Sequence, residues 1–253
     1  MKKILVTGFA AAAFCGTPAL AADMPVRAPA YKAAAPAPYD PWTGCYIGAN
    51  VGGVWTDTKL TRVQDGTTPV NDTQASVHAD GWAYGGQIGC DYRFNNNWVA
   101  GVRGMWDGTS ARGTAQTPIF NNGNFPDQFY NVKIRAFETV TGRIGILINP
   151  TLLVYGTGGV AWVQNHVALT DALAGGQVWA TNNTGVGYDV GAGVSWIFAP
   201  SWEFWVEYDH IGIGGHNFSV VEQLIVPGRT EVTRLKQSDD KLLVGLNYRF
   251  GAH

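Results

Sequence analysis

The side chains of this chain best suited to acid–base chemistry are its histidines and an aspartate next to one of them. The five histidines are scattered, at His78, His166, His210, His216 and His253. Their spacings do not match the short ligand spacings of a zinc site. Asp209 directly precedes His210, but adjacent residues on a strand point to opposite faces, so the two make a poor catalytic dyad. We therefore expect a protein that is not an enzyme, with no catalytic residue, no metal site and no bound cofactor.

A second chemical feature is a set of charged residues that recur at alternate positions within otherwise apolar stretches. They share one face with glycine and serine, while branched aliphatic and aromatic residues occupy the other face. The set comprises Arg93, Arg103, Arg143, Glu203, Glu207, Asp209, Lys241 and Arg249. A soluble barrel of the lipocalin kind would line its interior with the apolar face. A membrane barrel does the reverse, so this arrangement predicts a lipid-facing apolar wall around a charged lumen network.

The elements that must position these charges are strands, because the apolar residues recur with a period of two. The clearest case is the last stretch, residues 240–250, whose even positions from Leu242 to Phe250 are apolar or aromatic. The same alternation predicts strands at residues 45–55, 82–94, 98–107, 133–148, 152–163, 188–198, 202–209 and 240–250. The expected fold is all-β, a transmembrane eight-stranded antiparallel up-and-down barrel.

The connections between these strands alternate strictly between short and long. Tight turns are expected at residues 95–97, 149–151 and 199–201. Long polar stretches occupy residues 56–80, 108–131, 164–183 and 212–237. Outer-membrane barrels have short turns on the periplasmic side and longer extracellular loops. The pattern therefore predicts short periplasmic turns, long extracellular loops, and both ends of the barrel on the periplasmic side.

The start of the chain has the composition of a targeting segment. Lys2 and Lys3 precede a short apolar stretch, and Ala19-Leu20-Ala21 fits a small-x-small cleavage pattern. We expect a signal peptide over residues 1–21 and an Ala/Pro-rich flexible leader over residues 22–41. The barrel domain is then expected over residues 42–253.

Two cysteines, Cys45 and Cys90, remain after removal of the signal peptide, in a chain exported to an oxidising compartment. Facing residues of an antiparallel pair have a constant index sum, here 135, which centres the hairpin between Thr67 and Thr68. The odd sum also points both side chains outward. The geometry is compatible with a disulfide. The alternative is two free thiols that face lipid as small hydrophobic groups.

Several segments resemble a known family of small barrels. They are Ala22-Asp23-Met24-Pro25, the run from Trp42 to Gly52, Gly142-Arg143-Ile144-Gly145, the run from Tyr155 to Ala161, and the run from Val244 to Phe250. Together they are similar to the porin-family or immunogenic outer-membrane proteins of alphaproteobacteria, in the OmpA-like β-barrel group. Family members commonly carry an aromatic residue where Cys45 stands. They usually end at the position of Phe250, where Gly251-Ala252-His253 follows here.

The resemblance implies a structural protein of the bacterial outer membrane that contributes to envelope integrity and exposes loops at the surface. The alternative is a narrow, low-conductance porin for small solutes, and an outer-membrane barrel enzyme is the least favoured interpretation. The expected partners are outer-membrane lipid and, during insertion, the barrel-assembly machinery. Without Lys2 and Lys3 of the signal peptide, the formal net charge changes from −2 to −4, and this mild acidity suggests no nucleic acid partner. Nothing in the sequence identifies a partner of the loops.

Overall fold

A computed structural model describes residues 40–117, 128–172, 175–221 and 227–250 of the chain. The expected signal peptide, nearly all of the expected leader and the tail at residues 251–253 lie outside these described residues. The described part contains no helix long and apolar enough to cross a membrane.

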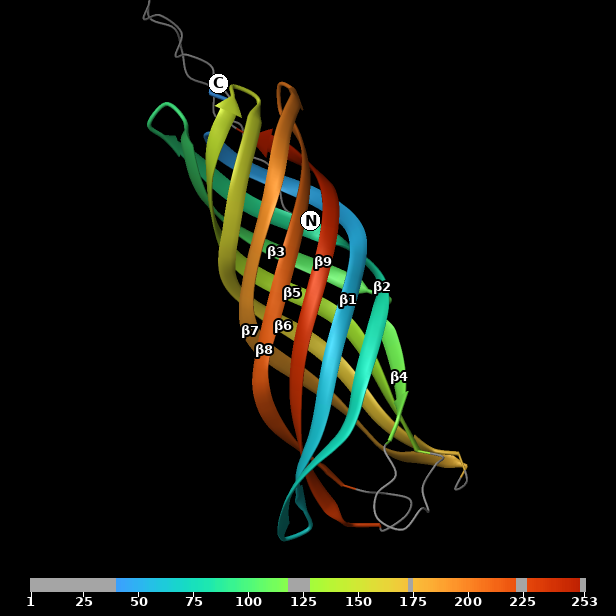
Figure 1. Ribbon diagram of the computed structural model, residues 1–253. Coiled ribbons are helices and arrows are strands. Elements are labelled where there is room, and N and C mark those ends of the chain that lie inside the picture. The colour runs from blue at the N-terminus through green and yellow to red at the C-terminus, as the bar shows by residue number, and fades with distance from the viewer. Residues whose placement is uncertain (1–39, 118–127, 173–174, 222–226, 251–253) are drawn as a thin grey trace, which may run out of the picture. The chain divides into compact units, whose positions relative to one another are not determined.

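The described chain folds into a single antiparallel sheet that closes on itself (Figure 1). Strands that follow one another along the chain pair with each other, except β3 and β4, which each pair with β2 and β5. β1 pairs with both β2 and β9, which closes the ring. The strands are β1 (Gly44–Asp65), β2 (Thr68–Phe94), β3 (Trp98–Thr109), β4 (Arg112–Gln116), β5 (Gln128–Asn149), β6 (Leu152–Asp171), β7 (Gly176–Ala199), β8 (Trp202–Val221) and β9 (Thr230–Phe250).

β3 and β4 act as one strand of the barrel, because both lie between β2 and β5. The two are separated only by Ser110 and Ala111. Even there, the Ser110 amide donates to the Trp82 carbonyl at 3.0 Å. The barrel therefore has a ring of eight strands, and the predicted fold class is confirmed.

Three of the four long polar stretches, residues 56–80, 164–183 and 212–237, form strands for most of their length, and the described part of the fourth is also mostly strand. The prediction that these stretches are loops is therefore wrong for the residues that the structure describes. β1 and β2, for example, stay paired out to Asp65 and Thr68, which leaves only Gly66 and Thr67 between them. The turn falls slightly earlier than the index sum predicts, because the register shifts at two places in the outer part of β1. The three short turns lie together at the top of Figure 1, and the extended hairpins project from the other end.

The outer wall of the barrel carries an apolar band between two sets of exposed aromatic residues. The set next to the short turns consists of Phe94, Trp98, Phe198, Trp202 and Phe250, and the other set includes Trp55, Trp82, Trp106, Tyr188 and Tyr208. On β3, Trp98 and Trp106 are separated by about 20 Å along the membrane normal for a strand tilted by roughly 40°. This spacing approaches the apolar thickness of an outer-membrane barrel.

The interior changes character along the barrel axis. Between the two aromatic sets it is polar and charged, whereas the extended hairpins enclose an apolar core that includes Leu60, Val77, Ile134, Val167 and Leu235. The chain therefore switches from apolar-out in the membrane band to apolar-in beyond it. Bulges help to make the switch: the register shift at Arg135 moves the inward-facing positions of β5 from odd to even numbers.

Candidate functional site: the charged lumen

The lumen at the level of the membrane band is filled by ion pairs that join distant strands. Nearest the short turns, Asp91 of β2 and Glu203 of β8 alternate with Arg143 of β5 and Arg249 of β9. Arg249 Nη1 donates to Asp91 Oδ2 at 3.0 Å and to Glu203 Oε2 at 2.6 Å. Arg143 bonds Asp91 through Nη2 and lies 3.5 Å from Glu203 Oε1 through Nη1. The result is a closed set of two arginines and two carboxylates that ties four strands together.

Aromatic rings cover both arginines of this set. The Arg143 guanidinium lies 4.7 Å from the centroid of the Tyr155 ring and 5.5 Å from that of Tyr46. Arg249 lies 5.2 Å from the Tyr46 ring and 5.5 Å from the Trp42 ring. These contacts place the cations against apolar surface while their donors bind carboxylates, which fits charges withdrawn from water.

A second ion pair crosses the middle of the lumen. Arg103 of β3 meets Glu207 of β8 through two bonds, Nη1 to Oε2 at 2.8 Å and Nη2 to Oε1 at 2.5 Å. Farther from the short turns, Lys241 of β9 donates to Asp107 Oδ2 at 3.1 Å and lies 3.7 Å from Asp209 Oδ2. Neither oxygen of the Asp189 carboxylate, which is also buried, has a hydrogen-bond partner among the described residues.

The structure brings seven of the eight predicted network residues into the lumen, all 4% exposed or less. They are Arg103, Arg143, Glu203, Glu207, Asp209, Lys241 and Arg249. Arg93 is not among them. It lies at the end of β2, half-buried, where it donates to the Asn96 carbonyl at 3.0 Å and lies 3.5 Å from Asp40. Placing Arg93 in the lumen is therefore wrong, because the strand is already ending at the short turn.

Sequence reasoning missed several lumen residues that make up the rest of the network. Asp91, Asp107 and Asp189 sit on the same alternating face as the residues it found, so the alternation itself could have identified them. Trp205 was also missed. Its indole Nε1 donates to Asn247 Oδ1 at 3.2 Å, and Gln87 donates to the same oxygen at 2.6 Å.

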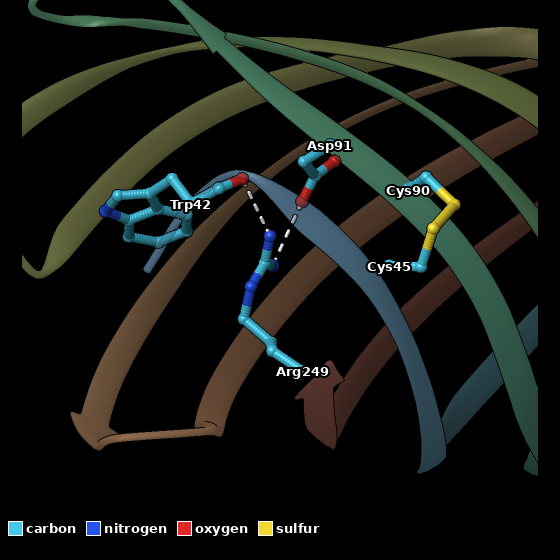
Figure 2. The surroundings of a disulfide bond; sticks show 5 residues. All are labelled: Trp42, Cys45, Cys90, Asp91 and Arg249. Atoms are coloured by element: carbon cyan, nitrogen blue, oxygen red, sulfur yellow. Dashed lines mark hydrogen bonds and ion pairs between the residues drawn. A yellow bond between two sulfur atoms is a disulfide. The ribbon is translucent and has the colours of Figure 1, made fainter. Parts of the chain in front are cut away.

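Trp42 closes the end of the lumen next to the short turns. From the sequence, Trp42 would be expected on the lipid-facing wall together with Trp98 and Trp202, because all three lie where strands begin next to the short-turn end. That expectation is wrong, because Trp42 is fully buried among Val99, Leu153 and Ile197. Its Nε1 donates to the Pro150 carbonyl at 2.9 Å, and its own carbonyl accepts a bond from Arg249 Nη2 at 2.9 Å. Figure 2 shows Arg249 bound to both the Trp42 carbonyl and Asp91.

Cys45 and Cys90 are paired directly across β1 and β2 and joined by a disulfide with an S–S distance of 2.05 Å (Figure 2). Their Cα atoms are 3.9 Å apart. Both residues are exposed on the outer wall, on the face opposite Tyr46 and Asp91. Since β1 also closes the ring against β9, the bond fixes the first hairpin beside the closing seam of the barrel.

The histidine next to Asp209 faces away from it. Asp209 is buried in the lumen, whereas His210 points outward and lies 2.8 Å from Asp240 Oδ1. The Tyr208 hydroxyl donates to the same oxygen at 2.6 Å. This outer cluster spans β8 and β9 at the level of the second aromatic set.

A closed ring with an apolar wall and a charged lumen is the pattern of membrane barrels. The family model described as "Outer membrane protein beta-barrel domain" matches residues 7–250. The chain belongs to this family. It is a protein of the bacterial outer membrane, and the resemblance seen in the sequence is confirmed.

Two relatives match this chain at low identity, one over its full length and one over part of it. The chain is 28% identical to the "31 kDa outer-membrane immunogenic protein" of Brucella melitensis over 256 residues, which cover 99% of this chain and 100% of that protein. It is 26% identical over 162 residues to an uncharacterized protein of Coxiella burnetii, covering 58% and 60% of the two chains.

Solved structures agree on the fold of this outer-membrane barrel. The outer membrane protein OprG of Pseudomonas aeruginosa superposes with a TM-score of 0.53 at 13% identity, over 83% of this chain and 98% of OprG. The outer membrane protease OmpT of Escherichia coli gives a TM-score of 0.51 at 11% identity, over 82% and 97% of the two chains. At such identities the likeness concerns the fold alone.

Proposed function

We propose that this outer-membrane barrel is a structural, non-enzymatic component of the envelope whose lumen is closed by its own side chains. The observation that carries the proposal is the burial of the lumen charges: Glu203, Glu207, Asp209 and Lys241 are each 0% exposed. An aqueous channel through the barrel would leave such groups hydrated. An interior of eight strands is just wide enough for side chains to fill it.

Closure is supported at three levels along the axis. Trp42 and its apolar neighbours fill the end next to the short turns. The ion pairs fill the membrane band. The apolar core around Ile134, Val167 and Leu235 fills the extended hairpins. A solute that crossed the barrel would have to disrupt all three.

The role that fits a closed barrel is to strengthen the outer membrane and to present a surface outside the cell. The extended hairpins continue well beyond the aromatic set around Trp106, so a folded body of the protein stands outside the bilayer. A deletion strain tests this role. Loss of the protein should increase sensitivity to detergents that the outer membrane normally excludes, and the wild-type chain should restore resistance. Unchanged sensitivity in the deletion strain would contradict the envelope role.

A narrow porin is the second candidate, and one observation favours it. The buried lumen residues include seven carboxylates but only four cations: Asp91, Asp107, Asp189, Glu203, Glu207, Asp209 and Asp239 against Arg103, Arg143, Lys241 and Arg249. Excess negative charge would favour the passage of small cations. Liposome swelling with small amino acids and sugars separates the candidates, because only a porin would speed their entry.

The partners proposed for this protein are outer-membrane lipid and, during insertion, the barrel-assembly machinery. Lipid contact follows from the exposed apolar band. Assembly machinery is proposed because a membrane barrel cannot leave its strand edges unpaired in lipid. No partner is proposed for the extended hairpins, and no catalytic residue, metal or cofactor is assigned.

A further inference from the structure

A group of basic residues on the outer wall has no obvious counterpart within the protein. We call Arg112 of β4, Lys133 and Arg135 of β5, and His166 of β6 the basic cluster. Arg112 faces Lys133 across β4 and β5, and Lys133 faces His166 across β5 and β6. Directly facing residues have Cβ atoms about 4.5–5.5 Å apart, and like charges in such positions destabilise a sheet. A row of this kind is favourable when an anion binds it.

The basic cluster points away from the barrel interior. Val132 and Ile134, which flank Lys133 along β5, are buried in the core, so Lys133 faces outward between them. Arg112 and Arg135 are exposed, and Lys133 and His166 are half-buried. Arg135 occupies the bulge in the pairing of β5 with β6, and a bulge re-aims the side chain it carries.

The carboxylates of the same outer wall are engaged elsewhere. Asp57 pairs with His78, Glu138 accepts a bond from Gln164 at 2.8 Å, and Asp240 binds Tyr208 and His210. Asp80 faces Arg112 in register. Among the described residues, however, Arg112, Lys133 and Arg135 form no ion pair within 4.0 Å. Within this described part of the chain, Lys133 and Arg135 therefore remain without a counter-charge, and the carboxylate that faces Arg112 across β2 and β4, Asp80, lies beyond ion-pair distance.

The height of the basic cluster relative to the bilayer indicates what could compensate it. His166 lies four positions beyond Trp162 along β6, which corresponds to about 10 Å along the membrane normal for a tilted strand. The headgroup layer occupies roughly 5–8 Å on each side of the hydrocarbon core. Long basic side chains can also reach back toward that layer. The backbone of the cluster thus lies just outside the headgroup layer, on the side of the extended hairpins, and its long side chains can reach the headgroups.

An apolar groove lies on the membrane side of the basic cluster, on the same part of the wall. It has a volume of about 570 Å³, and its lining includes Gly104, Trp106, Val140 and Trp162. Gly104 contributes to its depth, because a Cβ added there would meet no atom within 4 Å. Glu138 stands at the groove. Its negative charge would repel a phosphate at its own level and so favours a phosphate farther out, beside Arg135 and Lys133.

We propose that this surface binds a phosphorylated lipid of the outer leaflet, with its phosphate on the basic cluster and an acyl chain in the groove. Arginine binds phosphate through two parallel hydrogen bonds, and lysine adds a compact charge. The lipid, rather than a free anion, is the occupant that fits both the cations and the apolar groove beneath them. The inference does not depend on whether the lumen conducts.

Native mass spectrometry of the full chain in an uncharged detergent tests the proposal. The probes are phosphatidic acid and the diacylglycerol with the same chains, which differ only in the phosphate. The wild-type barrel should retain phosphatidic acid and release the diacylglycerol. Arg112→Gln combined with Lys133→Gln should weaken phosphatidic acid binding at least about tenfold, since each basic residue near a charged surface contributes about fivefold. Gly104→Leu should weaken phosphatidic acid binding by filling the groove.

The matched control removes two positive charges from the same outer wall but farther from the bilayer. Arg234 and Lys236 of β9 are exposed, and both lie at least six positions beyond Leu242, the last lipid-facing apolar residue of that strand. Arg234→Gln combined with Lys236→Gln should leave binding unchanged. If the double variant of the cluster does not fold, Arg135→Gln alone replaces it, with a loss of about fivefold expected.

Three results would overturn the proposal. Equal retention of diacylglycerol would show that the phosphate contributes nothing. Full competition by inorganic phosphate at the same concentration as the lipid would show a site for free anions. An equal loss in the Arg234 and Lys236 variant would show a general effect of net charge, with no role for the cluster itself.

Discussion

Arg103 and Glu207 stand diametrically opposite each other in the barrel and meet across its lumen. β3 and β8 are four strands apart in a ring of eight, yet the two side chains form a pair of parallel hydrogen bonds of 2.8 Å and 2.5 Å. Both side chains are at most 1% exposed. The pair therefore acts as a strut between opposite walls, at a level where an open channel would hold water.

Glu207→Gln should destabilise the barrel, because Arg103 would remain buried without its counter-charge. Removing one member of a buried ion pair costs about 3–5 kcal/mol. The measurement is the midpoint of urea unfolding in detergent. The folded fraction at each urea concentration is read from the folded and unfolded bands on an unheated gel. Replacing both residues with methionine should recover much of the loss, since an apolar pair leaves no unpaired charge. If the Glu207→Gln barrel is as stable as wild type, the Arg103–Glu207 ion pair does not stabilise the barrel.

Asp189→Asn should have the opposite effect of Glu207→Gln, although both exchange a carboxylate for an amide. Asp189 is fully buried, and its carboxylate oxygens have no hydrogen-bond partner among the described residues. A buried charge without hydrogen-bond partners is costly, so a neutral amide should leave the unfolding midpoint unchanged or raise it. A midpoint that falls as far as in Glu207→Gln would show that Asp189 has a stabilising partner.

Loss of the Cys45–Cys90 bond should lower resistance to unfolding without abolishing the fold. The bond closes a loop of 45 residues, and the stabilisation typical of disulfides is about 2–4 kcal/mol. Thermal unfolding with and without reductant measures the effect. The Cys45→Ser and Cys90→Ser double variant serves as the control, since reductant should not change its midpoint. Alkylation of both thiols in unreduced, denatured protein would show that the bond is absent.

Trp42→Ala should loosen the end of the barrel next to the short turns. The substitution removes a fully buried ring, and deleting a large aromatic from a packed site costs about 3–5 kcal/mol. Trp42→Phe keeps most of the apolar volume but loses the bond from Nε1 to the Pro150 carbonyl, so its loss should be smaller. The two midpoints of thermal unfolding test this order. Equal midpoints for the alanine variant and wild type would contradict the claim that Trp42 packs into the end of the barrel and closes it.

The membrane part of this fold is readable from the sequence because lipid and lumen impose opposite demands on alternate residues. On β9, Leu242, Val244 and Leu246 face lipid, while Lys241 and Arg249 face the lumen. The sequence therefore alternates between apolar and polar residues with a period of two. The three short turns could be located for the same reason, since the alternation stops at each of them.

The extended hairpins could not be recognised because the pattern that identifies a membrane strand inverts beyond the bilayer. Val163, Val167 and Leu169 of β6 face an apolar core, while Gln164 and His166 between them face water. A segment with polar residues on its outer face reads as a loop when lipid is expected there. Bulges such as that at Arg135 also move the inward-facing positions from odd to even numbers, so a search for a constant period of two misses the continuation of the strand.

The individual ion pairs also lie beyond sequence reasoning. The alternation places Arg103, Arg143, Glu203 and Glu207 in one lumen, but their heights depend on the stagger of the strands around the barrel. That stagger joins Arg103 to Glu207, and Arg143 to Glu203 and Asp91. Trp42 was misplaced because it precedes the first strand, where alternation says nothing about direction.

Single-channel recording of the purified barrel in a planar lipid bilayer tests the central claim most directly. A lumen closed by Trp42, the ion pairs and the outer core should give no steady current steps in molar potassium chloride. The Glu207→Gln and Trp42→Ala double variant, which removes one strut and the end closure, should give brief openings under the same conditions. Uniform, long-lived steps from the wild-type barrel, with a preference for cations, would contradict a closed lumen and establish the narrow porin instead.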